Sequence, residues 1–242
     1  MRDVTPKSLE WNDMTVSRYW RWLSKYPEQY FSYQFGDRIA HALRHYIRQG
    51  QRVLDYGCGT GFLCRHLTSF GADVWATDVS DEAVASANAI NRSVDGFRGA
   101  RSIDEAVKSG ETFDRIISVE VVEHLNDVQL SDFFAALHVL LDSSGLVFIT
   151  TPNEEVLSRS EVYCPQCDHV FHRWQHMRSF SAATLRQVVE KHGFDVVETY
   201  TTDFSKGRVP DPIAIAKSIV KSLCGRKQTR PHLVCIARKK DL

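Results

Sequence analysis

The sequence predicts a doubly wound α/β domain built on a mostly parallel sheet, and two observations support this fold class. Apolar runs of strand length alternate along the chain with segments whose apolar residues recur at helical spacing. The first apolar run, 53–56, ends in a loop with glycine at every second position, and a helical segment follows at once. Parallel strands joined by helices place their ligands at the carboxyl ends of the strands, so we expect a bound cofactor at this loop.

The expected elements follow one another in the order that such a sheet requires. They are a helix at 36–48, a strand at 53–56, a helix at 62–70, a strand at 73–78, a helix opening at 80, strands at 97–103 and 113–119, a helix at 127–141, a strand at 145–151, a helix at 182–192, and strands at 194–201 and 232–237. Ser80 precedes Asp81 and Glu82, which is typical of a capped helix start. Residues 8–35 are unusually aromatic and predict short helices. Residues 1–50 then form a helical cap over the domain at 51–242.

Composition limits the classes of function. The chain has 242 residues, which suits one domain with additions, and its formal net charge is zero. A neutral chain has no general field for binding nucleic acid or acidic membranes. No apolar run has the length of a transmembrane helix, and the first residues lack the apolar core of a signal peptide, so we expect a cytoplasmic protein.

The chemistry of the glycine loop indicates which cofactor it holds. Gly57, Gly59 and Gly61 follow the pattern G-x-G-x-G, whereas a dinucleotide-binding loop has G-x-G-x-x-G. Asp55 lies on the strand before the loop, where a carboxylate suits a cationic ammonium or sulfonium group. Asp78 ends the next strand, where a ribose is commonly held. These residues favour S-adenosylmethionine over a nicotinamide dinucleotide.

The motifs resemble those of class I S-adenosylmethionine-dependent methyltransferases. They are the glycine loop with Asp55, then Asp78, then the strand 113–119 followed by Glu120, and the similarity runs from about residue 52 to the end of the chain. The resemblance implies a Rossmann-like, seven-stranded sheet whose last strand is antiparallel and inserted beside its predecessor. It also implies cofactor contacts at Asp78, Val79, Ser102, Ile103 and Glu120. In this family the N-terminal segment often acts as a lid, so Tyr30 or Tyr33 is expected at the cofactor, unless these aromatics only pack on the domain. The alternative is a Rossmann-like domain with a different nucleotide site.

A first candidate metal site follows the fourth core strand. Glu120, Glu123 and His124 can converge on one side of a helical turn, and two carboxylates with an imidazole suit Mg²⁺, Mn²⁺ or Zn²⁺. The pattern is similar to that of ubiquinone-pathway O-methyltransferases and small-RNA 2′-O-methyltransferases, and in the latter a downstream histidine, here His176, completes the site. In other methyltransferases the same glutamate holds the methionine end of the cofactor and the histidine caps a helix, without a metal.

A second candidate metal site lies in the segment 164–176. Cys164, Cys167, His172 and His176 have C-x₂-C and H-x₃-H spacings, which suit a structural zinc ion that clips the loop 151–180. The linker between the pairs is much shorter than in a zinc finger, so a redox pair, free thiols or a substrate-binding loop are the alternatives. Cys58, Cys64, Cys224 and Cys235 are interpreted as ordinary thiols, buried or at a helix end.

Methyl transfer is an in-line displacement that depends on positioning and on activation of the acceptor. We expect His124 or His176 to act as the base or metal ligand, Glu120 and Asp55 to serve the cofactor, and the loop 151–180 to contact the acceptor. By similarity, the acceptor is a small hydroxylated molecule such as a sugar or natural product. The alternatives are RNA, and a non-catalytic subunit that binds S-adenosylmethionine. A helix at 211–224, within the extra segment 205–230, is interpreted as a surface helix, a homodimer contact, a basic arm facing the substrate or a membrane-surface helix.

Overall fold

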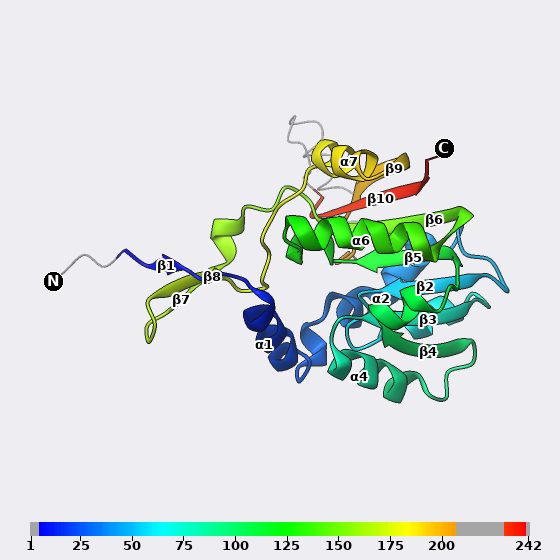
Figure 1. Cartoon of the computed structure of the whole chain (residues 1–242), viewed down its shortest axis with the longest axis horizontal. Coiled ribbons are helices and arrows are strands. Elements are labelled where there is room, and N and C mark those ends of the chain that lie inside the picture. Colours follow the sequence, from blue (N-terminus) through cyan, green and yellow to red (C-terminus); the bar gives the residue numbers. More distant parts are fainter. Residues whose placement is uncertain (1–4, 207–229, 241–242) are drawn as a thin grey trace.

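A seven-stranded sheet forms the centre of the structure, a computed structural model that describes residues 5–206 and 230–240. The strand order is β4-β3-β2-β5-β6-β10-β9. The strands are β2 Arg52–Tyr56, β3 Asp73–Asp78, β4 Phe97–Ser102, β5 Phe113–Val119, β6 Leu141–Pro152, β9 Phe194–Thr202 and β10 His232–Lys239. Neighbours from β4 to β6 run parallel, whereas β10 is antiparallel to both β6 and β9 (Figure 1). The predicted doubly wound sheet and its inserted antiparallel last strand are confirmed.

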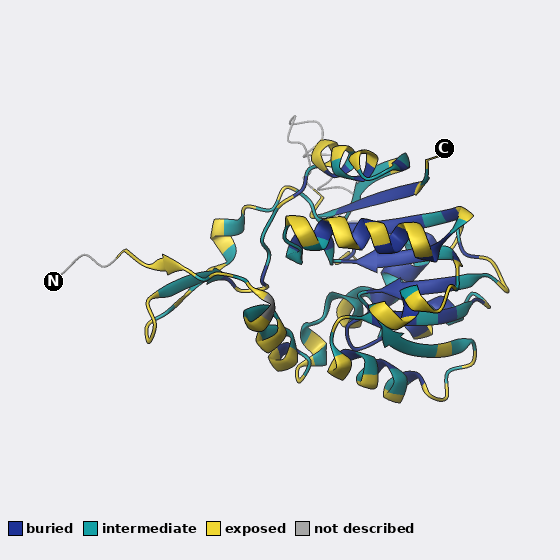
Figure 2. Ribbon diagram, in the orientation of Figure 1, coloured by how far each residue is buried: buried dark blue, intermediate teal, exposed yellow. Residues whose placement is uncertain are grey.

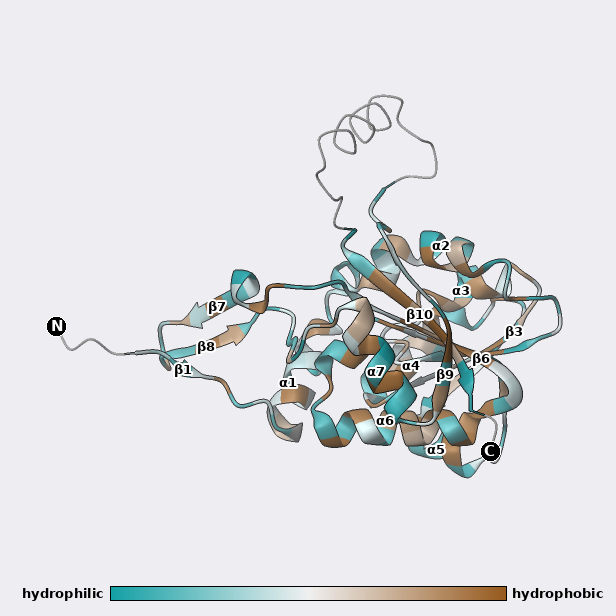
Figure 3. Ribbon diagram, turned by 90° about the horizontal axis from the view of Figure 1, so that it is seen from above, coloured by the Kyte–Doolittle hydropathy of each residue, from teal (hydrophilic) through white to brown (hydrophobic). Residues whose placement is uncertain are grey.

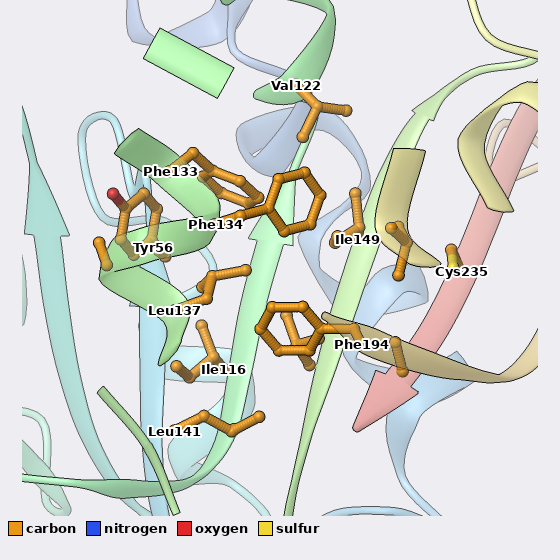
Figure 4. Close-up of a cluster of buried hydrophobic side chains, with 14 of the residues drawn as sticks. Tyr56, Ile116, Val122, Phe133, Phe134, Leu137, Leu141, Ile149, Phe194 and Cys235 are labelled. Atoms are coloured by element: carbon orange, nitrogen blue, oxygen red, sulfur yellow. The ribbon is translucent and has the colours of Figure 1, made fainter. Parts of the chain in front are cut away.

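Helices cover both faces of this sheet. They are α1 Asp13–Leu23, η1 Pro27–Gln29, α2 Phe31–Leu43, α3 Cys64–Thr68, α4 Asp81–Asn91, α5 Ile103–Lys108, η2 Val122–His124, α6 Asp127–Leu140, η3 Leu157–Ser160 and α7 Ala182–Lys191. One apolar cluster joins the sheet to α5, α6 and α7 and includes Ala106, Leu137 and Val189. Figure 4 shows Phe133 and Leu137 of α6 within this cluster. A second joins it to α2, α3 and α4 through Ile39, Leu67 and Ala87. The central strands are therefore buried on both faces, as in parallel sheets generally (Figure 2).

The local sequence signals place most boundaries. The strands predicted at 73–78 and 113–119 coincide with β3 and β5, and the side chain of Ser80 caps α4 by accepting from the N–H of Ala83 at 3.2 Å. The helix expected at 36–48 instead spans 31–43. Phe31 and Phe35 extend its apolar stripe toward the N-terminus. Gly36 therefore lies inside the helix, where the ring of His66 packs so closely that a Cβ at this position would lie 3.0 Å from it.

A small second sheet stands apart from the first and was not predicted. It consists of β1 Lys7–Ser8, β8 His169–His172 and β7 Glu161–Cys164, with β1 parallel to β8 and β7 antiparallel to it. The antiparallel strands β7 and β8 form a hairpin, and Figures 1 and 3 show from two directions that this hairpin extends away from the main sheet. Its strands are too short and too polar to stand out in the sequence, where 151–180 was interpreted as a loop.

The N-terminal segment is attached to this hairpin. Besides the β1–β8 pairing, the ring of Trp11 meets the edge of Phe171 with centroids 6.1 Å apart, and the hydroxyl of Tyr19 donates to the carbonyl of Arg173 at 2.8 Å. Within the described ranges, no helix has the length and apolarity to cross a membrane. The helix expected at 211–224 and Cys224 lie outside the described residues.

Candidate cofactor and acceptor site

The glycine loop after β2 is fastened to the end of β3. The N–H groups of Gly57 and Cys58 donate to the carbonyl of Thr77 at 2.8 and 3.0 Å. The carboxylate of Asp78 accepts from the N–H of Gly59 at 2.8 Å and from that of Ser80 at 3.0 Å. Burial raises the pKa of Asp78, although these backbone donors oppose the rise. Asp78 thus fixes the loop and the start of α4 while facing the space above them.

Glycine is required at two positions of the loop for different structural reasons. Gly59 has φ +52°, and a Cβ there would lie 2.6 Å from Cε1 of Tyr30, so Tyr30 packs directly over the loop. Gly61 has φ +83°, and its Cβ would lie 2.6 Å from the Cβ of Ala87 in α4. Gly59 therefore shapes the mouth of the site, whereas Gly61 allows close packing beneath it.

A cavity of about 900 Å³ opens above this loop. Of the residues predicted for the site, it is lined by Gly57, Gly59, Asp78, Val79, Ile103, Glu120, His124 and His176. Trp20 and Tyr30 line it from the N-terminal segment, which supports the expected contact of Tyr30, while Tyr33 is 48% exposed and packs on Phe62. Its size suits a cofactor together with a small second molecule.

Several predicted residues lie outside the cavity wall. They are Asp55, Gly61, Ser102, Glu123, Cys164, Cys167 and His172. Asp55 is buried beneath the loop, where the thiol of Cys64 donates to it at 3.6 Å, and burial raises the pKa of Asp55 to about 7. Ser102 caps α5 by accepting from the N–H of Glu105. Both side chains support the loops of the site in this structure.

Glu120 stands at the end of β5 in an unusual backbone conformation. It has φ +53°, and its carboxyl accepts from the hydroxyl of Thr150 at 2.9 Å. Positive φ is rare for a residue with a side chain and is often found at functional sites. Burial raises the pKa of Glu120. The turn aims Glu120 into the cavity and starts the 3₁₀ segment η2, which carries Glu123 and His124.

Glu123 and His124 form a buried pair at the edge of the cavity. One oxygen of Glu123, Oε2, accepts from the hydroxyl of Thr151 at 3.0 Å, while Oε1 finds no hydrogen-bond partner among the described residues and lies 3.8 Å from Nε2 of His124. Burial and the neighbouring Glu120 raise the pKa of Glu123. Burial and the nearby His176 lower the pKa of His124 to about 3, so this imidazole is neutral near pH 7.

The partner of His124 fixes its tautomer. Nδ1 lies 3.4 Å from the carbonyl oxygen of Gln175, which can only accept, and the backbone of Glu120 also interacts with the ring. We assign the proton to Nδ1, which leaves the lone pair on Nε2. Gln175 is itself fully buried, and its side chain accepts from the indole N–H of Trp20 at 3.1 Å and donates to the carbonyl of His124 at 3.0 Å. The indole also meets the His124 ring edge-on at 4.9 Å. His124 is held rigidly with Nε2 toward Glu123.

Glu155 joins two further histidines. Nδ1 of His172 accepts from the backbone N–H groups of Trp174 and His176 at 3.3 and 3.1 Å, so the proton of this ring belongs on Nε2. That nitrogen lies 3.3 Å from Oε1 of Glu155, and Nδ1 of His176 lies 2.5 Å from Oε2. The two rings stack with centroids 4.4 Å apart. Burial alone would raise the pKa of Glu155, but its contacts with His176 and His172 lower it below the ordinary value. The carboxylate therefore accepts from Nδ1–H of His176, and Nε2 of His176 is the ring nitrogen that this carboxylate does not engage.

Two groups of possible metal ligands share His176. In each group the ligand atoms lie within 4.8 Å of one another; one comprises Glu123, His124 and His176, the other Glu155, His172 and His176. In the second group Nε2 of His172 also lacks a hydrogen-bond partner among the described residues. This group still fits a metal less well, because Nδ1 of His172 accepts from two backbone N–H groups and the proton is therefore assigned to Nε2, where a metal would bind. The first group fits well, because the free oxygen of Glu123 and Nε2 of His124 face each other. Glu120, expected in this set, is in neither group.

The cysteine pair lies away from these histidines. Cys164 is paired with His169 next to the β7–β8 turn, whereas His172 is paired with Glu161 at the opposite end of the hairpin. Over the described part of the chain, neither group of metal ligands includes Cys164 or Cys167. The structure thus does not bring together the expected Cys164, Cys167, His172 and His176 clip, because three residues of extended strand separate its two halves.

Sequence reasoning missed Glu155 and Gln175, and it placed Trp20 only within the aromatic cap, without a partner. None of them belongs to a spaced motif: Glu155 follows another glutamate in a loop, and Gln175 stands between an aromatic residue and His176. Only the folded chain brings the three beside His124 and His176. The position of Glu155 a few residues after the end of β6 was the available signal, because active-site loops follow parallel strands.

Comparisons with known proteins agree with this geometry. A family model described as a methyltransferase domain matches residues 19–199. Ubiquinone biosynthesis O-methyltransferases of Brucella ovis and Mesorhizobium japonicum are 37% and 36% identical over 107 residues, which is 43% of this chain and 42% of each relative. The match therefore spans less than half the length of these curated relatives.

Solved structures share the fold. A 1,6-didemethyltoxoflavin-N1-methyltransferase of Burkholderia thailandensis, with its substrate and S-adenosylhomocysteine bound, superimposes with a TM-score of 0.64 at 18% identity, covering 98% of this chain and 94% of that one. An S-adenosylmethionine-dependent methyltransferase of Clostridium acetobutylicum gives 0.62 at 14% identity, covering 94% and 100%. At these identities the likeness concerns the fold.

Proposed function

Because the chain belongs to the family of S-adenosylmethionine-dependent methyltransferase domains, we propose that it methylates a hydroxyl group of a small hydroxylated acceptor, such as a sugar-like molecule or natural product. The O-methyltransferase names of the curated relatives support a hydroxyl acceptor. The concave cavity of about 900 Å³ and the zero net charge of the chain favour a small acceptor over RNA.

The cofactor half of the cavity is assigned to the strand ends. Asp78 binds the ribose hydroxyls, Val79 and Ile103 enclose the adenine, and Gly57 and Gly59 let the cofactor approach the backbone. Glu120 binds the methionine end from the tip of β5. S-adenosylmethionine supplies an electrophilic methyl group on its sulfonium. Residues 1–50 act as the cap, with Trp20 and Tyr30 excluding water from the cavity.

The acceptor half is assigned to the wall that carries His176. One observation carries this assignment: Glu155 takes up Nδ1–H of His176, which leaves Nε2 of a cavity-lining imidazole free to accept a proton. Nε2 of His176 would take the proton of the acceptor hydroxyl as its oxygen receives the methyl group, and the cofactor would leave as the neutral thioether. The carboxylate of Glu155 stabilises the imidazolium that forms. The pKa of His124, about 3, makes that residue a weak base near neutrality.

A metal-assisted form of the same reaction is the second candidate. It is favoured by the partnerless Oε1 of buried Glu123, which faces Nε2 of His124. With His176 these residues would hold a divalent ion such as Zn²⁺ or Mg²⁺, which would lower the pKa of the acceptor hydroxyl. Removal of ions by chelator would then abolish turnover and leave cofactor binding unchanged.

The test measures methyl transfer from labelled S-adenosylmethionine to a panel of sugars and phenols, with and without chelator. His176→Asn should lower kcat ~10²–10⁴-fold and leave cofactor affinity unchanged in calorimetry. His45→Asn, at an exposed histidine outside the cavity, is the matched control. Turnover that survives His176→Asn would refute the role of His176. Cofactor binding without turnover on any acceptor would favour a non-catalytic subunit.

A further inference from the structure

The turn between β7 and β8 has a firmly fixed conformation. The N–H of Asp168 donates to the carbonyl of Cys164 at 3.0 Å, and Asp168 has φ +54°, a left-handed conformation that lets the chain reverse. The hydroxyl of Tyr163 donates to the Asp168 carboxylate at 2.5 Å, and the N–H of Lys7 in β1 donates to the Asp168 carbonyl at 2.8 Å. A turn held at this many points presents Cys164 and Cys167 in one orientation.

The sulfurs of Cys164 and Cys167 form one hydrogen-bonded pair. The thiol of Cys167 and the backbone N–H groups of Cys167 and Gln166 donate toward the sulfur of Cys164 and lower its pKa. The shared proton raises the pKa of Cys167, toward which the N–H of His169 is directed. Backbone N–H groups aimed at sulfur stabilise thiolate, the form of cysteine that binds metal. A proline after the first cysteine and a left-handed residue after the second complete a compact loop around a shared point.

A pair of thiolates supplies half of a structural zinc site, since such sites are four-coordinate and tetrahedral. Among the described residues, no third ligand atom lies within 4.8 Å of both sulfurs, because neither group of clustered ligands includes Cys164 or Cys167. The other described cysteines, Cys58, Cys64 and Cys235, are buried in the core and cannot reach the turn. A metal at the turn therefore takes its remaining ligands from elsewhere.

The position of the turn favours a second copy of this chain as the source. The hairpin extends from the main sheet, and its turn lies far from the helices that cover that sheet (Figures 1 and 3). Cys167 is exposed and Cys164 is partly exposed. A two-fold axis through two such turns would bring two identical pairs of sulfurs together, because each copy presents the same turn. The zero net charge of the chain gives no long-range repulsion between copies.

We infer that Cys164 and Cys167 form half of a tetrahedral zinc–thiolate site, whose other two sulfurs come from the same turn of a second copy. The site joins two chains through their hairpins and is separate from the cavity. It explains the C-x₂-C spacing without His172 and His176, which belong to the Glu155 network. The inference does not depend on the nature of the methyl acceptor.

The experiment measures the mass of the full chain in solution under reducing conditions, with zinc chloride added or with a chelator. We expect a dimer holding about one Zn²⁺ for every two chains, a monomer after chelation, and a monomer without tightly bound zinc for Cys164→Ser/Cys167→Ser. Gln166→Ala, in the same turn, should still form the dimer. Unchanged S-adenosylmethionine affinity shows that the double variant is folded.

Cobalt chloride provides a second readout, because Co²⁺ in a tetrahedral thiolate site has an intense visible spectrum that is lost in the double variant. A monomer that binds one zinc ion per chain through Cys164 and Cys167 would overturn the inference in favour of ligands from the same chain. Cys224→Ser then identifies the additional cysteine. A dimer that resists chelator and reductant, or a chain whose zinc content is unchanged in the double variant, would also overturn it.

Discussion

Oε2 of Glu155 lies 2.5 Å from Nδ1 of His176, and through Oε1 the same carboxylate contacts His172 at 3.3 Å. This contact decides which nitrogen of His176 faces the cavity as a base. Glu155 is therefore a positioning residue for the acceptor side of the site, in the manner of carboxylates that orient histidines in other enzymes.

Glu155→Gln should reduce kcat roughly 10–100-fold, because an amide orients the His176 ring but does not stabilise its cation. The affinity for S-adenosylmethionine should stay the same, since Glu155 is not part of the cavity wall at the glycine loop. Steady-state kinetics and calorimetry measure the two effects. Glu154→Gln, at the adjacent exposed glutamate, is the control. Equal losses in both variants would show that the loop is merely destabilised.

Asp78→Asn should weaken S-adenosylmethionine binding by ~1.5–3 kcal/mol, because a charged acceptor for the ribose is replaced by a neutral amide. The change is measured by calorimetry on the unliganded protein. Asp73→Asn provides a matched control at the other end of β3, where Asp73 pairs with Arg98 at the protein surface. If the two variants bind the cofactor alike, Asp78 does not contact it.

Gly59→Ala should weaken cofactor binding and lower the melting temperature. The new Cβ would lie 2.6 Å from the ring of Tyr30, adding an overpacking cost of ~1–3 kcal/mol to the strain of positive φ. Gly110→Ala separates the backbone strain from the overpacking, because Gly110 has φ +71° but nothing lies within 4 Å of a Cβ added there. Thermal unfolding should show the smaller loss for Gly110→Ala. Adding Tyr30→Ala should relieve the contact in the Gly59 variant, and a lack of any relief would rule out the ring as the cause.

Asp55→Asn should change how stability depends on pH. The pKa of Asp55 rises from 3.8 to about 7 on folding, mainly through burial. At a pH below the pKa of Asp55 in the unfolded chain, its contribution to the free energy of unfolding is fully present. This contribution is lost as the pH rises toward and past 7, and the loss is ~4 kcal/mol at most. The stability of the wild type relative to the variant should therefore fall between pH 4 and about 8.

Denaturant unfolding at a series of pH values, without cofactor, measures this difference. Groups such as His124 and Glu123 titrate in both proteins and largely cancel in the comparison, because neither contacts Asp55. A difference that does not vary with pH would mean that Asp55 is ionised in the folded protein.

The sheet could be predicted because its signals are local. Apolar runs at β3 and β5 fix those strands within a residue, and Ser80 marks the start of α4. The helix α5 was not predicted because it has only six residues. The β1–β8 pairing was not predicted because it joins distant parts of the chain. Glu123, His124 and His176 could be grouped by similarity to known motifs. Glu155 could not, because its role comes from a turn that brings its carboxylate under two histidines.

The pairing of β1 with β8 sets the order in which the molecule can be completed. Lys7 pairs with His169, which lies roughly 160 residues later in the chain, and contacts between such distant residues form late in folding. On the ribosome, the sheet strands up to β6 emerge before the hairpin that anchors the first residues. The glycine loop therefore has its framework while the N-terminal segment is still unattached. Cofactor present during synthesis meets an open site, and the pairing of β1 with β8 closes the entrance afterwards.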